Sequence, residues 1–447
     1  MVKRGKKATE SSDRRGKKIR EPFTFLGQTF EFIDKPTVKR HLFYLLLISI
    51  ATKLLVLVAT TAVFHSFVDL FDIGYYLQNA VLLTQGQIPY LNFSFDYPAL
   101  VFIPIGIALV PTLATQNAMA FVYSFQLLMV LCDIGTLLCV YFIGLRIGNE
   151  KTAFFAGLIY ATAFSAAYFV LTKYDAFPTL LLMGAVLFTI YGMGIRGYIS
   201  ATLGFFAKIF PAIAFPFMIL YNAKTTSLRQ EILSTVKVVV PFFVILLLPF
   251  LILRPDVINT YLFATGAGVG VYVNTATFTL YTYVHDIAHL GLGSAIISLF
   301  MYLLMGLVLI LLLWIAFKAP AKRPLTLLKL LACALFAFVF FTKFHSPQYI
   351  VWYTPFLALL VADDLLKIGL FYLTQALAYI EFPLMFNTYY VNLQYTNPVG
   401  SGGWYLTLVF FTLENLAFII LFYIVLRPKE GLMAALKNYY PDVIRRK

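Results

Sequence analysis

Three aspartates stand close together just after the first long apolar stretch of the chain. Asp69, Asp72 and Asp96 fall in or beside a polar segment, residues 71–100, that separates two hydrophobic runs. At the end of an apolar helix the low dielectric raises the pKa of a carboxylate toward that of a useful general base. Acidic groups placed in this way in a membrane protein typically act on a substrate. The segment is therefore the first candidate for catalysis.

Basic residues in or beside apolar runs form a second group. Lys208 stands between Ala207 and Ile209 inside an apolar run, where an ammonium group is costly unless it faces a cavity or an anion. Arg254 directly follows another apolar run. The position of Lys208 in an apolar run predicts that it contacts a phosphate. Arg254 fits either a phosphate contact or an ordinary cation at a helix end.

Three other polar residues leave alternatives open. Lys173 and Asp175 occupy one turn, where they fit either a mutual ion pair or contact with a phosphate. His345 precedes the segment SPQY (346–349) at the end of an apolar run. It fits a residue that orients the base, one that shares the charge of a phosphate, or an ordinary interfacial histidine.

The composition requires that membrane helices position these residues. Of the 447 residues, 61% are hydrophobic and only 12% are charged, which is too little polar side chain to cover a water-soluble fold of this size. The net charge of +14 is concentrated in the first forty residues, in short loops and at the C-terminal end, where it orients helices rather than binding nucleic acid. The three cysteines lie inside apolar runs and predict no metal site.

Apolar windows of about 20 residues predict the membrane spans. Two shorter runs are exceptions. Residues 99–113 predict a re-entrant or interfacial helix because two prolines interrupt them, and residues 198–221 predict a helical hairpin broken near Lys208 and Pro211, because basic residues flank both ends. The clear spans are predicted at residues 42–64, 119–146, 152–171, 176–193, 232–253, 290–317, 325–341, 348–362, 365–380 and 404–426.

This arrangement also predicts the topology. The basic residues between spans and both chain ends become cytoplasmic, and the polar segments that carry the candidate residues gather on the outer side. Irregular backbone at membrane depth lines a cavity, so we expect one outward-facing site. The expected organisation is a basic cytoplasmic tail (1–40), a transmembrane catalytic domain (41–427) and a second cytoplasmic tail (428–447).

Several motifs resemble one family of membrane enzymes. LLTQGQIPY (82–90) followed by FSFDYPAL (93–100) is similar to the first outer loop of the GT-C glycosyltransferases, and most similar to the mannosyltransferases that use polyprenol-phosphate mannose. The chain departs from their pattern in having two residues between Asp69 and Asp72 instead of one, and YPAL instead of YPPL. Further similar motifs, in the same order, are KYDAFP (173–178), LGFFAKIFPAIAFP (203–216) and HSPQYIVWYTP (345–355).

The resemblance implies a fold and a reaction. The fold would be all-α and polytopic, of GT-C type, with roughly 10–13 transmembrane helices, a re-entrant segment and a large first outer loop. The enzyme would transfer a hexose, mannose by resemblance, from a polyprenyl-phosphate donor to a lipid- or glycan-linked acceptor with inversion. Such a donor carries its own leaving group, so no cofactor is expected and no nucleotide cradle is needed.

The same resemblance distributes the roles. Asp72, fourteen residues before Gly86, is in register with the family's acidic residue and is the expected base, with Asp69 as the next choice. The alternative for Asp72 is a helix N-cap or an interfacial acid, and for Asp69 it is an N-terminal cap. Asp96 fits either a residue that binds acceptor hydroxyls or one that holds the turn. His345 is expected to assist. The expected substrate-binding residues are Asp96, Tyr97, Lys173, Asp175, Lys208, Arg254, Gln348 and Tyr349.

Two other functions fit a basic polytopic protein. A transporter or flippase of lipid-linked sugars would also be helical, but such proteins commonly carry internal repeats and polar residues near the midplane of both halves. We find no repeat at half length, and the polar residues considered above fall toward one side. A non-catalytic assembly subunit would tolerate the loss of Asp72.

Overall fold

The structure, a computed structural model, describes residues 24–25, 28–29, 35–63, 69–259, 270–390 and 399–427. The chain divides into two compact units, Met1–Tyr44 and Leu45–Lys447. In the first unit, strands β1 (Thr24–Phe25) and β2 (Gln28–Thr29) pair antiparallel. Helix α1 (Pro36–Val58) begins in this unit and ends in the second. The predicted C-terminal tail and most of the predicted N-terminal tail lie outside the described residues.

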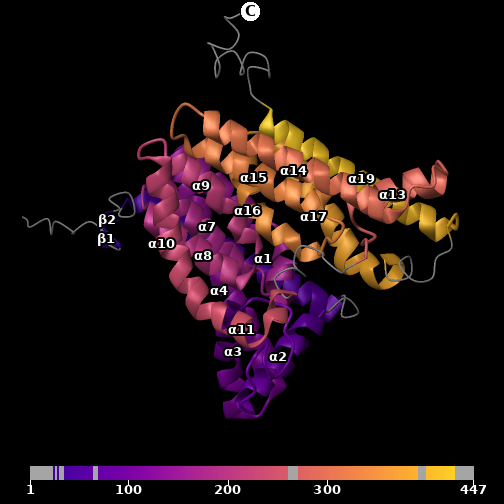
Figure 1. The fold of residues 1–447 in the computed structure, drawn as a ribbon, viewed down its shortest axis with the longest axis horizontal. Coiled ribbons are helices and arrows are strands. Elements are labelled where there is room, and N and C mark those ends of the chain that lie inside the picture. The colour runs from indigo at the N-terminus through magenta and orange to yellow at the C-terminus, as the bar shows by residue number, and fades with distance from the viewer. Residues whose placement is uncertain are drawn as a thin grey trace, which may run out of the picture. The chain divides into compact units, whose positions relative to one another are not determined.

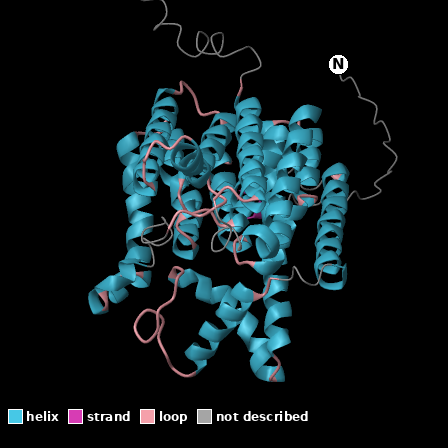
Figure 2. Ribbon diagram, turned by 90° about the vertical axis from the view of Figure 1, so that its right-hand side faces the viewer, coloured by secondary structure: helices cyan, strands magenta, loops and turns pink. Residues whose placement is uncertain are grey.

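Every regular element described in the second unit is helical, which confirms the predicted all-α architecture (Figures 1 and 2). After α1 the elements are η2 (Ala59–Val63), α2 (Phe71–Thr84), η4 (Ala99–Val101), α3 (Phe102–Thr115), α4 (Ala118–Ile147), α5 (Glu150–Ala161), α6 (Phe164–Thr172), α7 (Ala176–Ile190), α8 (Gly194–Ala207), η5 (Phe210–Ile213), α9 (Ala214–Asn222), α10 (Leu228–Leu246), α11 (Leu248–Leu253), η6 (Pro255–Val257), α13 (Ala276–Tyr281), η7 (Thr282–Ile287), α14 (Ser294–Lys318), α15 (Pro324–Phe341), η8 (Pro347–Tyr349), α16 (Ile350–Val361), α17 (Leu365–Tyr379), η9 (Ile380–Tyr390) and α19 (Gly402–Leu426).

The helices confirm an integral, polytopic membrane protein. Among the described residues, six helices are long and apolar enough to cross a membrane, and α5 with α6, bent by 57°, adds a seventh if the pair is one span. This count is below the roughly 10–13 helices expected. The predicted span at 232–253 is divided between α10 and α11 and is not one of the candidates, and those at 176–193 and 348–362 are helical segments of 15 residues, Ala176–Ile190 and Pro347–Val361. At 1.5 Å per residue these are shorter than the roughly 30 Å of hydrocarbon, and they pack inside the bundle. The six are Pro36–Val63, Ala118–Ile147, Ser294–Lys318, Pro324–Phe341, Leu365–Met385 and Gly402–Leu426.

The predicted break in the 198–221 run is confirmed. Helix α8 ends at Ala207, Lys208 is extended (φ −161°, ψ 149°), and η5 and α9 follow. The chain then folds back, because Nδ2 of Asn222 at the end of α9 donates to the hydroxyl of Tyr198 near the start of α8, at 3.2 Å. The α8–α9 segment is therefore a hairpin whose two ends lie next to each other and whose turn is at Lys208.

A hydrophobic core fixes the first loop, which we define as residues 69–101. Tyr76 of α2 and Phe95 of the following turn are completely or almost completely buried, and they pack in one cluster with Phe121 and Phe125 of α4. The α6–α7 turn and the end of α8 contribute to the same cluster. The loop is therefore a packed part of the fold, which holds its polar side chains in place.

Candidate functional site

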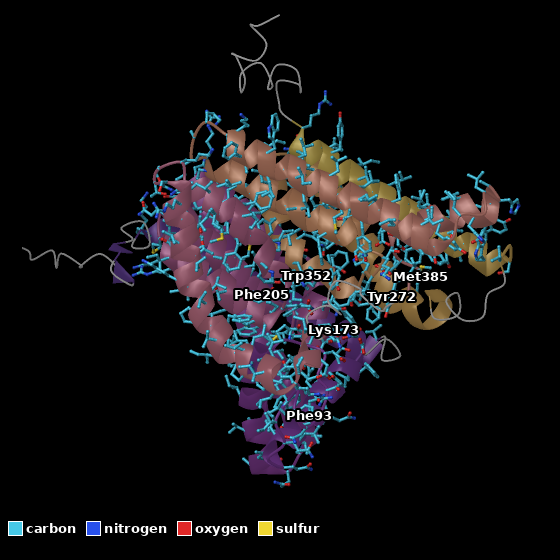
Figure 3. All side chains as sticks on the ribbon, in the orientation of Figure 1. Phe93, Lys173, Phe205, Tyr272, Trp352 and Met385 are labelled. Atoms are coloured by element: carbon cyan, nitrogen blue, oxygen red, sulfur yellow. The ribbon has the colours of Figure 1, made fainter. Side chains whose placement is uncertain are left out.

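Lys173 lies between two carboxylates of the first loop, and Figure 3 labels it. Its Nζ is 2.7 Å from Oδ2 of Asp69 and 3.0 Å from Oδ2 of Asp72. Asp72 stands in the first turn of α2, whereas Asp69 precedes α2 and also accepts a hydrogen bond from the Phe71 N–H at 3.0 Å. We call these three residues the acidic cluster. Its formal charge is −1, and both carboxylate side chains are 17% exposed.

The acidic cluster combines a charged lysine with a carboxyl group of raised pKa. Burial raises the pKa of Asp72 and outweighs the attraction of Lys173, which lowers it. Burial lowers the pKa of Lys173, but the two carboxylates outweigh this effect and keep the ammonium group charged. A raised carboxyl pKa suits a general base near neutral pH. Asp72 can therefore take a proton from an approaching hydroxyl while Lys173 stays paired with Asp69.

Lys208 and Asp175 form a separate ion pair, which we call the buried pair. Lys208 Nζ is 2.7 Å from Oδ1 of Asp175, and the lysine and aspartate side chains are 10% and 0% exposed. Trp352 Nε1 donates to the same carboxylate oxygen at 2.5 Å. The anion that Lys208 faces is therefore a carboxylate of the protein itself, which already neutralises its charge. This pairing favours a structural role over binding of a phosphate.

Aromatic rings enclose the ammonium group of Lys208. The centroids of Tyr174 and Trp352 are 4.7 and 5.1 Å from Nζ, and those of Tyr349 and Tyr97 are 5.8 and 5.9 Å away. Tyr349 also stacks on Trp352, with centroids 3.7 Å apart. Desolvated cation–π contacts of this kind stabilise the charge further. The buried pair thus joins the first loop, the α6–α7 turn, the tip of the α8–α9 hairpin and the start of α16.

The structure excludes two of the open alternatives, the pair of Lys173 with Asp175 and the N-cap role of Asp72. Lys173 and Asp175 do not pair with each other, because Lys173 contacts the first loop and Asp175 contacts Lys208. The residue at the N-cap of α2 is Leu70, without a capping side chain, so Asp72 is not the N-cap. Asp69, by contrast, does bond to the N-terminal backbone of α2.

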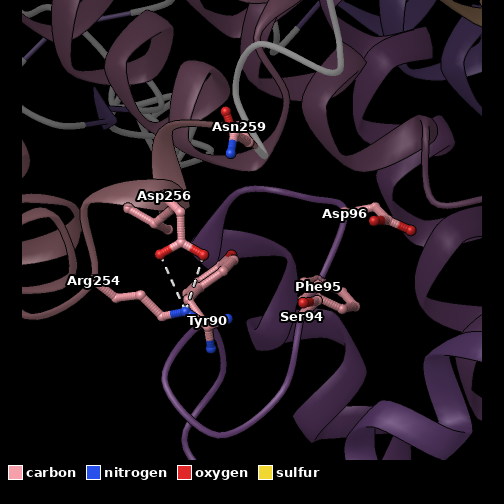
Figure 4. A pocket seen from close by; sticks show the side chains of 8 residues that line it. Tyr90, Ser94, Phe95, Asp96, Arg254, Asp256 and Asn259 are labelled. Carbon is pink, nitrogen blue, oxygen red and sulfur yellow. Dashed lines mark hydrogen bonds and ion pairs between the residues drawn. The ribbon is translucent and has the colours of Figure 1, made fainter. Parts of the chain in front are cut away.

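The predicted residues Asp96 and Arg254 have partners outside these two groups. Asp96 accepts a hydrogen bond from the hydroxyl of Tyr75 at 3.1 Å, and burial raises the pKa of Tyr75 to about 12. Arg254 Nε lies 3.1 Å from each carboxylate oxygen of Asp256, and Nη1 donates to the Leu91 carbonyl at 3.1 Å. Figure 4 shows this arrangement. Arg254 is thus a half-buried, paired cation.

His345 and Gln348 belong to the segment that leads into α16. Burial lowers the pKa of His345 to about 4, so its imidazole is neutral at pH 7 and carries no charge to share with a phosphate. Gln348 accepts a hydrogen bond from the Ser346 hydroxyl. The half-buried Lys343 precedes this segment, and no ion pair of its side chain is found among the described residues.

The structure also shows polar residues that the sequence interpretation did not single out. Trp352 belongs to the motif HSPQYIVWYTP (345–355) and lies one helical turn after Gln348 and Tyr349. This spacing, which puts the three side chains on one face of a helix, could have identified it from the sequence. Lys53 and Asp133 form an ion pair at 2.5 Å inside two candidate spans. Glu381 and Glu414 are buried in two other candidate spans. The expectation that the polar residues lie toward one side is therefore incomplete.

No group of three or more potential metal-ligating residues of the His, Cys, Asp and Glu types occurs in the part of the chain that the structure describes. No protein-family model matches the sequence, and no curated protein matches it.

Among solved structures, the chain is similar to crystal structures of the oligosaccharyltransferase of Archaeoglobus fulgidus. The apo form shows 11% identity and a TM-score of 0.42, with 88% of this chain and 56% of that chain covered. The complex with Zn and sulfate shows 11% identity and a TM-score of 0.35, with 90% and 52% covered. The chain spans about half the length of the solved structures that it matches.

Proposed function

We propose that the protein is a membrane glycosyltransferase that moves a hexose from a polyprenyl-phosphate donor to a lipid- or glycan-linked acceptor, with inversion. The observation that carries this proposal is the acidic cluster. In it the partly exposed carboxyl group of Asp72 has a raised pKa and lies 3.0 Å from the ammonium group of Lys173. Inversion in one displacement needs a base on the acceptor side and no second carboxylate nucleophile. Mannose as the sugar rests on the motif resemblance.

Asp72 acts as the base in this proposal. Its carboxylate takes the proton of the acceptor hydroxyl while the oxygen attacks the anomeric carbon and the bond to the lipid phosphate breaks. Asp69 stays paired with Lys173 and with the Phe71 N–H, which leaves it less free to accept a proton. Lys173 is a positioning residue that holds both carboxylates.

The departing phosphate needs a cation, and we propose Lys343 for this role instead of Lys208 or Arg254. Lys208 and Arg254 are each paired with an aspartate, so their charges are already balanced. Lys343 is half-buried, stands two residues before His345, and is bonded through its carbonyl to the Tyr272 N–H at 2.9 Å. An unbalanced ammonium group of this kind stabilises a developing phosphate charge better than a neutralised one.

The proposal is tested with purified full-length protein in lipid nanodiscs. Labelled mannosyl polyprenyl phosphate is supplied with a lipid extract of the source membranes, and incorporation of label into the extract is measured. We expect transfer from the lipid-phosphate donor and none from a nucleotide-activated mannose. Transfer from the nucleotide sugar alone would contradict the proposed donor class.

A carrier of lipid-linked sugars is the second candidate, because Lys53 and Asp133 pair inside two candidate spans, as polar residues of transporters do near the membrane midplane. A carrier would move the lipid-linked sugar across a vesicle membrane without breaking the bond between sugar and phosphate. Recovery of the intact donor on the opposite side, with no free polyprenyl phosphate, would favour this second function.

We also propose that the site faces the outer side of the membrane, with both termini in the cytoplasm. A cysteine at Asn92, exposed in the first loop, should react with an impermeant thiol reagent in intact cells. A cysteine at Ser227, just after the α8–α9 hairpin, should not react. The reverse labelling pattern would contradict this orientation.

A further inference from the structure

A cavity of about 260 Å³ lies between the first loop and η6, and no residue of the acidic cluster lines it. Figure 4 shows its polar side chains: Arg254 and Asp256 from the η6 side, Ser94 and Asp96 from the first loop, and Asn259 above them. Its volume falls just below the range of about 300–1,000 Å³ that is typical of drug-sized ligands. The occupant is therefore a small unit, of the size of one sugar ring.

The Arg254–Asp256 pair gives the cavity both donors and acceptors. A guanidinium group has five N–H donors. One N–H, on Nε, is shared between the two oxygens of Asp256, and one on Nη1 bonds to the Leu91 carbonyl, which leaves three for a ligand. The Asp256 side chain is 55% exposed, so its carboxylate keeps accessible lone pairs.

The charge of the cavity selects against an anion. Asp256 balances the positive charge of Arg254, and Asp96 adds a further carboxylate at the edge of the cavity, so a phosphate would find no unbalanced positive charge there. Ser94 and Asn259 add groups that both donate and accept hydrogen bonds. A hydroxyl group likewise donates and accepts. Mixed donors and acceptors without an unbalanced positive charge therefore suit a neutral polyol.

We infer that this cavity binds a neutral sugar ring of the acceptor through its hydroxyl groups. Asp96 connects it to the acidic cluster: its carboxylate turns away from Arg254 in Figure 4 and accepts from Tyr75, which lies three residues after Asp72 on α2. A ring in the cavity therefore lies beside the helix that carries the base. Only the description of this ring as part of the acceptor rests on the proposed function.

Protection from chemical labelling tests this inference without requiring the transfer reaction. Ser94→Cys places a thiol in the cavity, and its labelling rate by an impermeant thiol reagent is measured with and without methyl α-mannoside. At a concentration of about twice its Kd, the mannoside leaves about one site in three empty, so labelling should slow about threefold. Ala114→Cys, exposed outside the cavity, is the matched control and should keep its rate.

Further variants and ligands test whether the protection comes from binding of a neutral sugar at the Arg254–Asp256 pair. Asp256→Asn in the Ser94→Cys background should abolish the protection, whereas Asp363→Asn, which alters a comparable exposed ion pair elsewhere, should retain it. Protection by inorganic phosphate but not by the mannoside would overturn the inference in favour of an anion site. Protection that requires a divalent cation and disappears with a chelator would overturn it as well. Failure of protection with normal transfer activity would refute this site and leave the proposed function intact.

Discussion

The acidic cluster and the buried pair both consist of lysine and aspartate, but they differ in charge balance and in exposure. The acidic cluster has two carboxylates for one lysine and is partly exposed, at 17% for each aspartate side chain. The buried pair has one carboxylate for one lysine, is almost closed to solvent, and is surrounded by four aromatic rings, one of which, Trp352, also donates a hydrogen bond to the carboxylate. A group that must exchange a proton needs access and a charge imbalance. A group that must hold helices together needs neither.

This difference changes the interpretation of a buried lysine. An ammonium group in an apolar run suggests an anion site on the sequence alone. Once a carboxylate lies 2.7 Å away, the same residue is costly to remove, because the carboxylate would remain buried without a partner. Charge count and exposure, rather than residue type, separate the two regions.

The largest expected effect is on turnover in the acidic cluster. Asp72→Asn removes the proposed base, and turnover should fall by about 10² to 10⁴, the usual range for loss of a general base. Donor binding should persist. Asp69→Asn should cost less, because Asp69 is held by Lys173 and the Phe71 N–H. Initial rates of transfer measure both variants, and an inactive Asp69→Asn beside a normal Asp72→Asn would move the role to Asp69.

The next effect is on stability in the buried pair. Lys208→Met leaves Asp175 ionised and buried, which should lower the free energy of unfolding by about 3–5 kcal/mol. Lys208→Met with Asp175→Asn should recover much of this loss, because the amide oxygen still accepts from Trp352. Thermal unfolding in one detergent checks both. A stable Lys208→Met variant that has lost donor affinity would return Lys208 to phosphate binding.

A smaller effect is expected for the proposed phosphate cation. Lys343→Met should weaken donor binding by about 10- to 100-fold, the equivalent of one lost hydrogen bond to a charged group. Its unfolding temperature should stay unchanged, because no described carboxylate loses a partner. Competition with labelled donor gives the affinity. Unaltered donor affinity would exclude Lys343 from the site.

The smallest effect is a shift in pH dependence. Lys173 lowers the pKa of Asp72 against the larger effect of burial, so Lys173→Met should raise that pKa further. The base acts as the carboxylate, which is present above its pKa, so the acidic limb of the rate should move to higher pH. Lys367→Met, which alters an exposed pair with Asp363, should leave the limb in place. Transfer rates from about pH 5 to 9 test the shift, and an unmoved limb would contradict the role of Lys173.

The sequence predicts the architecture of the site better than its contacts. The break at Lys208 followed from a charge and a proline in an apolar run with basic residues at both ends, and the structure confirms it. The partners of Lys173 could not be predicted from the sequence. Lys173 and Asp175 are two residues apart, yet each has another partner, and the partners of Lys173 lie about a hundred residues earlier in the chain.

The count of spans shows a second limit of sequence patterns. A hydropathy window recognises apolar segments but does not distinguish a lipid-facing span from a short helix buried among others. The segments at 176–193 and 348–362 are of the second kind: the first begins directly after Asp175 of the buried pair, and the second carries Trp352, which donates to Asp175. Their apolar character comes from packing in the protein core.

The most direct test of the account measures two quantities on the same preparations of Asp72→Asn and Asp175→Asn: the transfer rate per folded molecule and the unfolding temperature. Burial raises the pKa of Asp72, so its ionised form contributes no stability at pH 7, and removing its charge should leave the unfolding temperature unchanged or higher while transfer is lost. Asp175→Asn should show the opposite, a lower unfolding temperature with transfer retained. Loss of stability in Asp72→Asn together with loss of transfer in a fully folded Asp175→Asn would contradict the division between the acidic cluster and the buried pair.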